Sequence, residues 1–111
     1  MSDQLTHGAF LEQLDSMFRL DLQGTNAIEL KLTEVSALTS ARRQEVFSIV
    51  FRGPLTVVLP QRMYRLEHDE LGSLDLLLVP IKKDDEGVDY EAVFNRLLEF
   101  NVNDGLGQRP S

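Results

Sequence analysis

The sequence predicts a mainly β fold: a small antiparallel barrel or sandwich of about six strands in a meander, with one short N-terminal helix. Apolar and polar residues alternate with a period of two in six separate segments, which is the spacing of strands that bury one face. Most connections between these segments are short, whereas a parallel crossover needs about a dozen residues or more. Consecutive strands are therefore expected to pair in antiparallel fashion.

The length of the chain bounds its organisation. A chain of 111 residues fits one domain with one core. We expect a single β-rich domain over residues 1–102 and a flexible C-terminal tail over residues 103–111, because the sequence turns polar and glycine-rich from Asn103 onward. No internal repeat or low-complexity tract divides the chain further.

Composition and charge argue against several kinds of partner and chemistry. The 18 acidic and 11 basic residues give a net charge of −7, which disfavours nucleic acid and anionic membranes as partners. The longest apolar run, Leu76–Val79, is far shorter than the ~20 residues of a transmembrane helix. The absence of cysteine excludes disulfides, thiolate nucleophiles and cysteine-ligated zinc. No secretory signal begins the chain, so a cytoplasmic location is expected.

The first expected element is a helix. Thr6 is a residue type that caps helix N-termini, and the apolar residues Phe10, Leu11, Leu14 and Met17 after it fall on one helical stripe. We expect this helix to cover part of the core.

The next two segments predict a hairpin. The period changes to two from Phe18, and the polar stretch "QGTN" separates the first run from the second. The residues expected to face the core are Phe18, Leu20, Leu22, Ile28, Leu30 and Leu32.

A polar connection precedes the third strand. The stretch "SALTSARRQ" predicts an exposed connection that could include a helical turn, and its basic pair Arg42 and Arg43 is expected to be solvated. The strand at residues 46–52 then places Phe47, Ile49 and Phe51 on one face and Val46, Ser48 and Val50 on the other. Both faces are thus at least partly apolar. Gly53 and Pro54 end the strand, and the apolar stretch "LTVVLPQ" is expected to be a loop or a short edge strand on the core.

The last three strands follow the same logic. The loop "HDEL" joins two of them and ends at Gly72, which tolerates a positive φ. After Pro80 the acidic turn "KKDDEG" is expected, and it leads into the final strand. The inward positions are Tyr64, Leu66, His68, Leu74, Leu76, Leu78, Val88, Tyr90, Ala92 and Phe94, while Leu77 and Val79 face outward.

Four blocks of the sequence carry a resemblance to a known family. The blocks "FSIVFRGP", "LPQRMYRLEH", "LDLLLVPI" and "YEAVFN" resemble a small bacterial family of uncharacterised proteins with a domain of unknown function, over Leu5 to Phe94. The resemblance implies no catalytic residue and no cofactor. It is loosely associated with phage-tail-like components, which implies an accessory or assembly role.

The candidate reactive groups have simpler explanations. His68 beside Asp69 and Glu70 could serve as a general base or a metal ligand, and a hydrolase using His68 is the third functional hypothesis. Consecutive residues of a hairpin loop point in different directions, however, so a solvated turn is the preferred interpretation. The acidic residues around Gly87 lack the spacing of a calcium loop. We expect no catalytic residue, no metal site and no cofactor.

Surplus apolar surface is the feature with functional weight. Two strands are apolar on both faces, so either the chain's own loop and C-terminal segment cover them or a partner does. The leading hypothesis is a non-enzymatic structural or interaction module that binds a protein partner or self-associates. The alternative is a small β-barrel that binds an apolar ligand. The expected partner contacts are Val46, Val50, Leu77, Val79, Leu97, Leu98 and Phe100.

Overall fold

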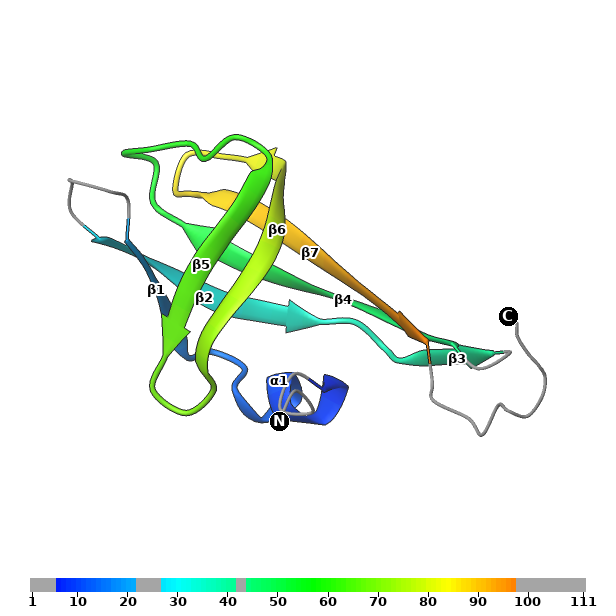
Figure 1. The fold of residues 1–111 in the computed structure, drawn as a ribbon. Helices are drawn as coiled ribbons and strands as arrows, with labels where there is room; N and C mark the ends of the chain where they lie inside the picture. Colours follow the sequence, from blue (N-terminus) through cyan, green and yellow to red (C-terminus); the bar gives the residue numbers. More distant parts are fainter. Residues whose placement is uncertain (1–5, 22–26, 42–43, 98–111) are drawn as a thin grey trace.

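One short helix and seven strands make up the fold. The computed structural model describes residues 6–21, 27–41 and 44–97 (Figure 1). Along the chain the elements are α1 (His7–Glu12), β1 (Met17–Asp21), β2 (Ala27–Val35), β3 (Thr39–Ala41), β4 (Gln44–Gly53), β5 (Arg62–His68), β6 (Gly72–Lys83) and β7 (Val88–Leu97). No described helix is long and apolar enough to cross a membrane.

Six of the strands close into an antiparallel barrel. The ring runs β1, β2, β4, β7, β6, β5 and back to β1, and it closes because β2 pairs with β4 while β1 pairs with β5. The short strand β3 pairs with β4 as an additional strand. The predicted mainly β barrel with one N-terminal helix is therefore confirmed.

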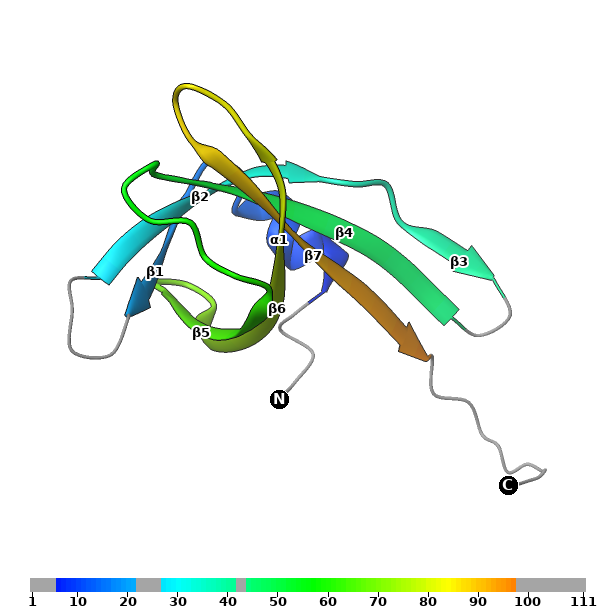
Figure 2. The ribbon, with the colours of Figure 1, turned by 90° about the horizontal axis from the view of Figure 1, so that it is seen from above.

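The order of the strands departs from a single meander in one place. Strands β1, β2 and β4 form one three-stranded meander and β5, β6 and β7 form another, but β4 and β5 are not neighbours. Residues 54–61 instead carry the chain across one end of the barrel (Figure 2). The alternation of side chains predicts which face a residue takes but not which strand lies beside it, and this connection is long enough to cross.

The interior follows the predicted alternation. The strand residues expected to face inward, as far as the structure describes them, are buried or, for Ile28 and Phe94, partly buried against the core. The buried apolar residues are Phe10, Phe18, Leu20, Leu30, Leu32, Phe47, Ile49, Phe51, Leu59, Tyr64, Leu66, Leu74, Leu76, Leu78, Val88, Tyr90 and Ala92. Fully burying one large apolar side chain contributes roughly 1.5–3 kcal/mol, so this core is the main source of stability.

The helix closes one end of the barrel with a single side chain. Thr6 caps α1 as predicted, because its Oγ1 accepts a hydrogen bond of 3.1 Å from the backbone N–H of Ala9. Phe10 is fully buried, but the predicted stripe was wrong for Leu11, Leu14 and Met17, which are 44%, 39% and 41% exposed. The helix ends at Glu12 and Met17 opens β1, so the helix is too short to carry a stripe.

Two further expectations need correction. The connection predicted to be exposed, for which a helical turn was an option, contains the strand β3 instead, and Arg42 and Arg43 lie outside the described residues. The turn expected at "KKDDEG" begins later, because β6 continues through Pro80 to Lys83, and the register shifts between Pro80 and Lys82. A bulge tolerates proline because the ladder is already interrupted there. The positive φ predicted for Gly72 is confirmed at 78°.

The molecule is elongated by an arm. Beyond the barrel, β4 and β7 continue as a pair from Val46 opposite Asn95 to Gln44 opposite Leu97, with β3 along the other edge of β4. The radius of gyration is 16.2 Å, whereas a compact chain of about this length has one of about 13 Å. Figure 1 shows this arm projecting from the barrel.

Candidate functional site

His68, the candidate base, is a buried and fully hydrogen-bonded side chain. Its Nδ1 accepts hydrogen bonds from the backbone N–H groups of Glu70 and Leu71 at 2.9 and 3.1 Å. Its Nε2 lies 2.9 Å from the Oγ of Ser16, whose hydroxyl donates to the carbonyl oxygen of Gln13 at 2.6 Å. Because backbone amides only donate, Nδ1 is unprotonated and Nε2 carries the proton.

This arrangement opposes a catalytic use of His68. A base that activates Ser16 would have to accept at Nε2, but that nitrogen donates to the serine instead. The neighbouring carboxylates do not orient the ring: Asp69 forms an ion pair of 3.2 Å with Arg19 on β1. His68 therefore acts as a cap for the turn between β5 and β6 and as a link to the segment before β1.

The stability of the barrel is expected to depend on the protonation of His68. Burial lowers the pKa of His68 below its usual value, against the opposing effect of Asp69 and Glu70. The unfolded chain then binds a proton more readily than the folded one, so the contribution of His68 is complete above about pH 6.5 and is lost as the pH falls through the folded-state pKa. Urea unfolding at pH 7.5 and 5.5 should show a fall in stability that is smaller in His68→Asn. An equal fall in both proteins would contradict this assignment.

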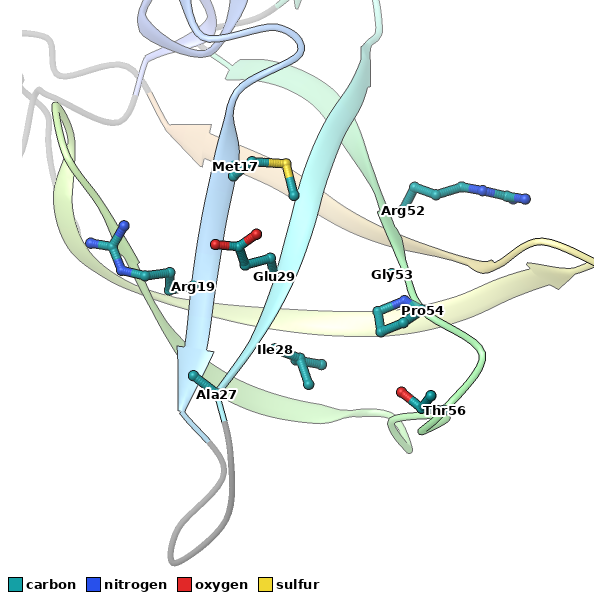
Figure 3. Close-up of a pocket in the computed structure, with 9 residues that line it drawn as sticks. All are labelled: Met17, Arg19, Ala27, Ile28, Glu29, Arg52, Gly53, Pro54 and Thr56. Carbon is teal, nitrogen blue, oxygen red and sulfur yellow. The ribbon is translucent and has the colours of Figure 1, made fainter.

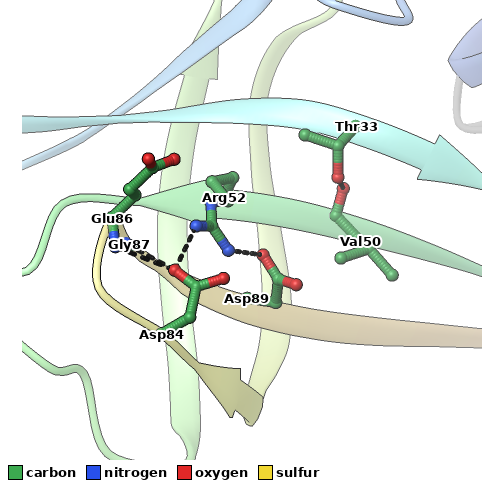
Figure 4. A network of polar contacts seen from close by, with 7 residues as sticks. All are labelled: Thr33, Val50, Arg52, Asp84, Glu86, Gly87 and Asp89. Atoms are coloured by element: carbon green, nitrogen blue, oxygen red, sulfur yellow. Dashed lines mark hydrogen bonds and ion pairs between the residues drawn. The ribbon is translucent and has the colours of Figure 1, made fainter.

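An ion-pair network joins the end of β4 to the hairpin between β6 and β7. The guanidinium of Arg52 contacts Asp84 through Nη2 and donates to Asp89 Oδ1 through Nη1 at 3.0 Å (Figure 4). Asp84 Oδ1 also accepts from the backbone N–H groups of Glu86 and Gly87 at 2.9 and 3.1 Å. These bonds, that of Arg52 first, hold the pKa of Asp84 at about 2. These contacts therefore hold the acidic turn against the end of β4.

Gly87→Ala in this turn is expected to lower the free energy of unfolding by about 1–3 kcal/mol. A Cβ at Gly87 would lie 2.7 Å from the carbonyl oxygen of Gly53 and 2.9 Å from Nε of Arg52, so the hairpin would have to move. Gly8→Ala is the control, because nothing lies within 4 Å of the Cβ it would add. Urea unfolding should give a lower free energy of unfolding for Gly87→Ala than for Gly8→Ala. Equal values would show that the hairpin moves to accommodate the Cβ without loss of stability.

A groove lies on the outside of the barrel beside the first half of β2. Its volume is about 730 Å³, and Figure 3 shows residues from β1, β2 and the chain around Gly53 and Pro54 along it. Met17 and Ile28 contribute apolar surface, and Glu29 contributes a charge. A β-barrel that binds an apolar ligand would hold it inside, whereas this groove is external and its lining is mixed. Among the described residues no group of three or more His, Cys, Asp or Glu is placed to hold a metal ion.

Exposed apolar side chains occur at outward positions of the neighbouring strands β5, β6 and β7, as well as on α1 and the connections. Met63 on β5 lies directly opposite Leu77 on β6, and they are 58% and 45% exposed. Val79 follows Leu77 on the same face of β6, and Val93 on β7 is 62% exposed. We call these four residues, with Val46 and Val50 on β4, the outer apolar face.

The structure brings together four of the predicted contact residues and leaves others undescribed. Val46, Val50, Leu77 and Val79 lie on adjoining strands, because Glu91 of β7 pairs with both Val50 and Val79 and Asn95 pairs with Val46. The backbone of Leu97 ends β7, while Leu98 and Phe100 lie outside the described residues.

Met63 and Val93 are the contact candidates that the sequence reasoning missed. Both occupy outward positions of alternating strands, so their exposure was predictable from the pattern. Met63 lies opposite Leu77 because their strands form a hairpin, whereas the position of Val93 depends on the pairing of β7 with β6 and β4, which the alternation does not reveal.

Comparison with known proteins identifies a family but no characterised relative. No curated protein and no solved structure matches the chain. The family described as a domain of unknown function, DUF6916, matches residues 5–94, which span α1 and nearly all of the barrel. The chain therefore belongs to the DUF6916 family, whose domain has no known function.

Proposed function

We propose that this protein is a non-enzymatic interaction module that binds a protein partner through the outer apolar face. The observation that carries the proposal is that Met63, Leu77, Val79 and Val93 occupy outward positions on three adjoining strands, and three of them are at least 45% exposed. Apolar patches of this kind, flanked by polar residues, are a common feature of protein contact sites.

The chemistry of the remaining side chains supports a binding role over a hydrolytic one. The histidine that could have served as a base is fixed in the tautomer that donates to Ser16. The strong polar contacts, such as those of Arg52 with Asp84 and Asp89, hold the end of β4 against the hairpin between β6 and β7. A more specific role, as a cytoplasmic accessory or assembly partner of a phage-tail-like bacterial complex, rests only on the resemblance of the four sequence blocks.

Site-specific photo-crosslinking in the native cell tests the proposal. A photoreactive residue at Leu77 should give a discrete crosslinked product, whereas the same residue at Leu55, which is 40% exposed on the connection after β4, should not. Leu77→Asp should then lower the affinity for the captured partner at least tenfold, while Leu55→Asp should not change it. A monomeric protein with no product specific to Leu77 would overturn the proposal.

A further inference from the structure

Strands β6 and β7 are paired over only part of their length. Their ladder runs from Lys83 opposite Val88 to Val79 opposite Glu91. Beyond it the two strands diverge, as Figures 1 and 2 both show. Among the described residues, no strand pairs with the β7-facing edge of β6 at residues 72–78 or with the β6-facing edge of β7 at residues 92–97.

The open edge of β7 has little of the usual protection against strand addition over residues 92–95. Edge strands commonly carry charged residues, proline or a bulge, which keep other chains from pairing with them. Residues 92–95 of β7 are Ala92, Val93, Phe94 and Asn95, which carry no charge and no proline, and Arg96 is the one charged residue of the edge at residues 92–97. Their pairing with β4 on the other edge is regular. Backbone groups at such an edge are best satisfied by another extended chain.

The side chains beside the opening indicate what that chain would carry. Leu77 and Val93 are exposed on the outer surface at the two edges, and they would contact alternate side chains of an added strand. Glu91 lies in the ladder between Val79 and Val50 and is half-buried. Within the described part of the chain its carboxylate makes no ion pair or hydrogen bond. An added strand with a cation near this position would complement it.

The overall charge favours a different protein over a second copy. Two copies of a chain with a net charge of −7 repel each other, whereas a basic segment is attracted to the same surface. Strand addition uses backbone hydrogen bonds for affinity and alternate side chains for specificity, so the partner needs an extended segment and not a folded complement.

We propose that the opening between β6 and β7 binds an extended segment of a partner protein as an added strand along residues 92–97 of β7. The segment places apolar side chains over Leu77 and Val93 and a lysine or arginine against Glu91. This inference rests on the proposed function and specifies the chemistry of the partner.

Two synthetic peptides test the inference on the full chain. Each has eight residues with capped ends and alternating valine and threonine; one has a central lysine, and the other has glutamine in its place. Hydrogen exchange followed by NMR should show that the lysine peptide slows exchange of backbone amides in residues 92–97, while exchange in β3 and β4 is unchanged. Glu91→Gln should lower the affinity for the lysine peptide by about two- to fivefold and leave the affinity for the glutamine peptide unchanged. The control Glu34→Gln, at an exposed position of β2, should affect neither.

The outcomes separate this inference from the proposed function. No slowing at residues 92–97, or slowing on another strand, would overturn the added strand. Light scattering that reveals a dimer with these amides already protected would assign the edge to a second copy and also overturn it. If either result occurs while Leu77→Asp still lowers the affinity for the crosslinked partner, the inference fails and the proposed function stands.

Discussion

Phe10→Ala is expected to lower the free energy of unfolding by about 3–5 kcal/mol, which is the usual cost of truncating a buried phenylalanine. Phe10 is fully buried, and its ring lies 5.2 Å from that of Phe94 and 6.1 Å from that of Phe47. The Phe47 and Phe94 rings stack on each other at 4.8 Å, so Phe10 completes an aromatic cluster where the arm leaves the barrel. Truncation would leave a cavity and remove one of the contacts that hold α1, which His7 also anchors through its Nε2, 2.8 Å from the carbonyl oxygen of Ser36.

Leu11→Ala is the matched control for this prediction, since Leu11 lies next to Phe10 in α1 and is 44% exposed. Its cost should stay below about 1 kcal/mol, in line with surface substitutions. Urea unfolding measures both variants, and loss of the near-ultraviolet signal of the aromatic cluster should accompany only Phe10→Ala. Equal costs would mean that α1 is not anchored by Phe10.

The predictable part of the fold is the part that a period of two encodes. The alternation placed Phe18, Leu30, Ile49 and Leu76 on inner faces, and all four are buried. The same alternation placed Leu77 on the outer face, where it is exposed. Each of these statements concerns one strand and its two faces, which local sequence determines.

The part that the sequence does not predict depends on which strands become neighbours. Closure of the barrel requires β1 to pair with β5 and β4 with β7, and these partners are far apart in the chain. Met63 lies opposite Leu77 because a hairpin joins their strands. The position of Val93 relative to Leu77 depends instead on where β7 diverges from β6. The role of His68 was also hidden, because its contact with Ser16 joins residues 52 positions apart.

Leu59→Ala is expected to cost about 2–5 kcal/mol, because it opens the other end of the barrel. Leu59 is 2% exposed and sits in the segment that crosses from β4 to β5. Two tyrosines fix the backbone of this segment: the N–H of Leu59 donates to the Tyr90 hydroxyl at 2.9 Å, and the Tyr64 hydroxyl donates to the carbonyl of Pro60 at 2.7 Å. Both bonds involve backbone atoms of the segment, so the substitution isolates the contribution of the Leu59 side chain.

Val58→Ala is the control that distinguishes loss of the buried Leu59 side chain from a general destabilisation of the crossing segment. Val58 precedes Leu59 on the same segment and is 46% exposed, so its truncation should cost less than about 1 kcal/mol in urea unfolding. A small cost for Leu59→Ala would mean that the segment collapses into the space or that the two tyrosine bonds alone hold it. A large cost confined to Leu59 would establish that its side chain fills the end of the barrel that residues 54–61 cross.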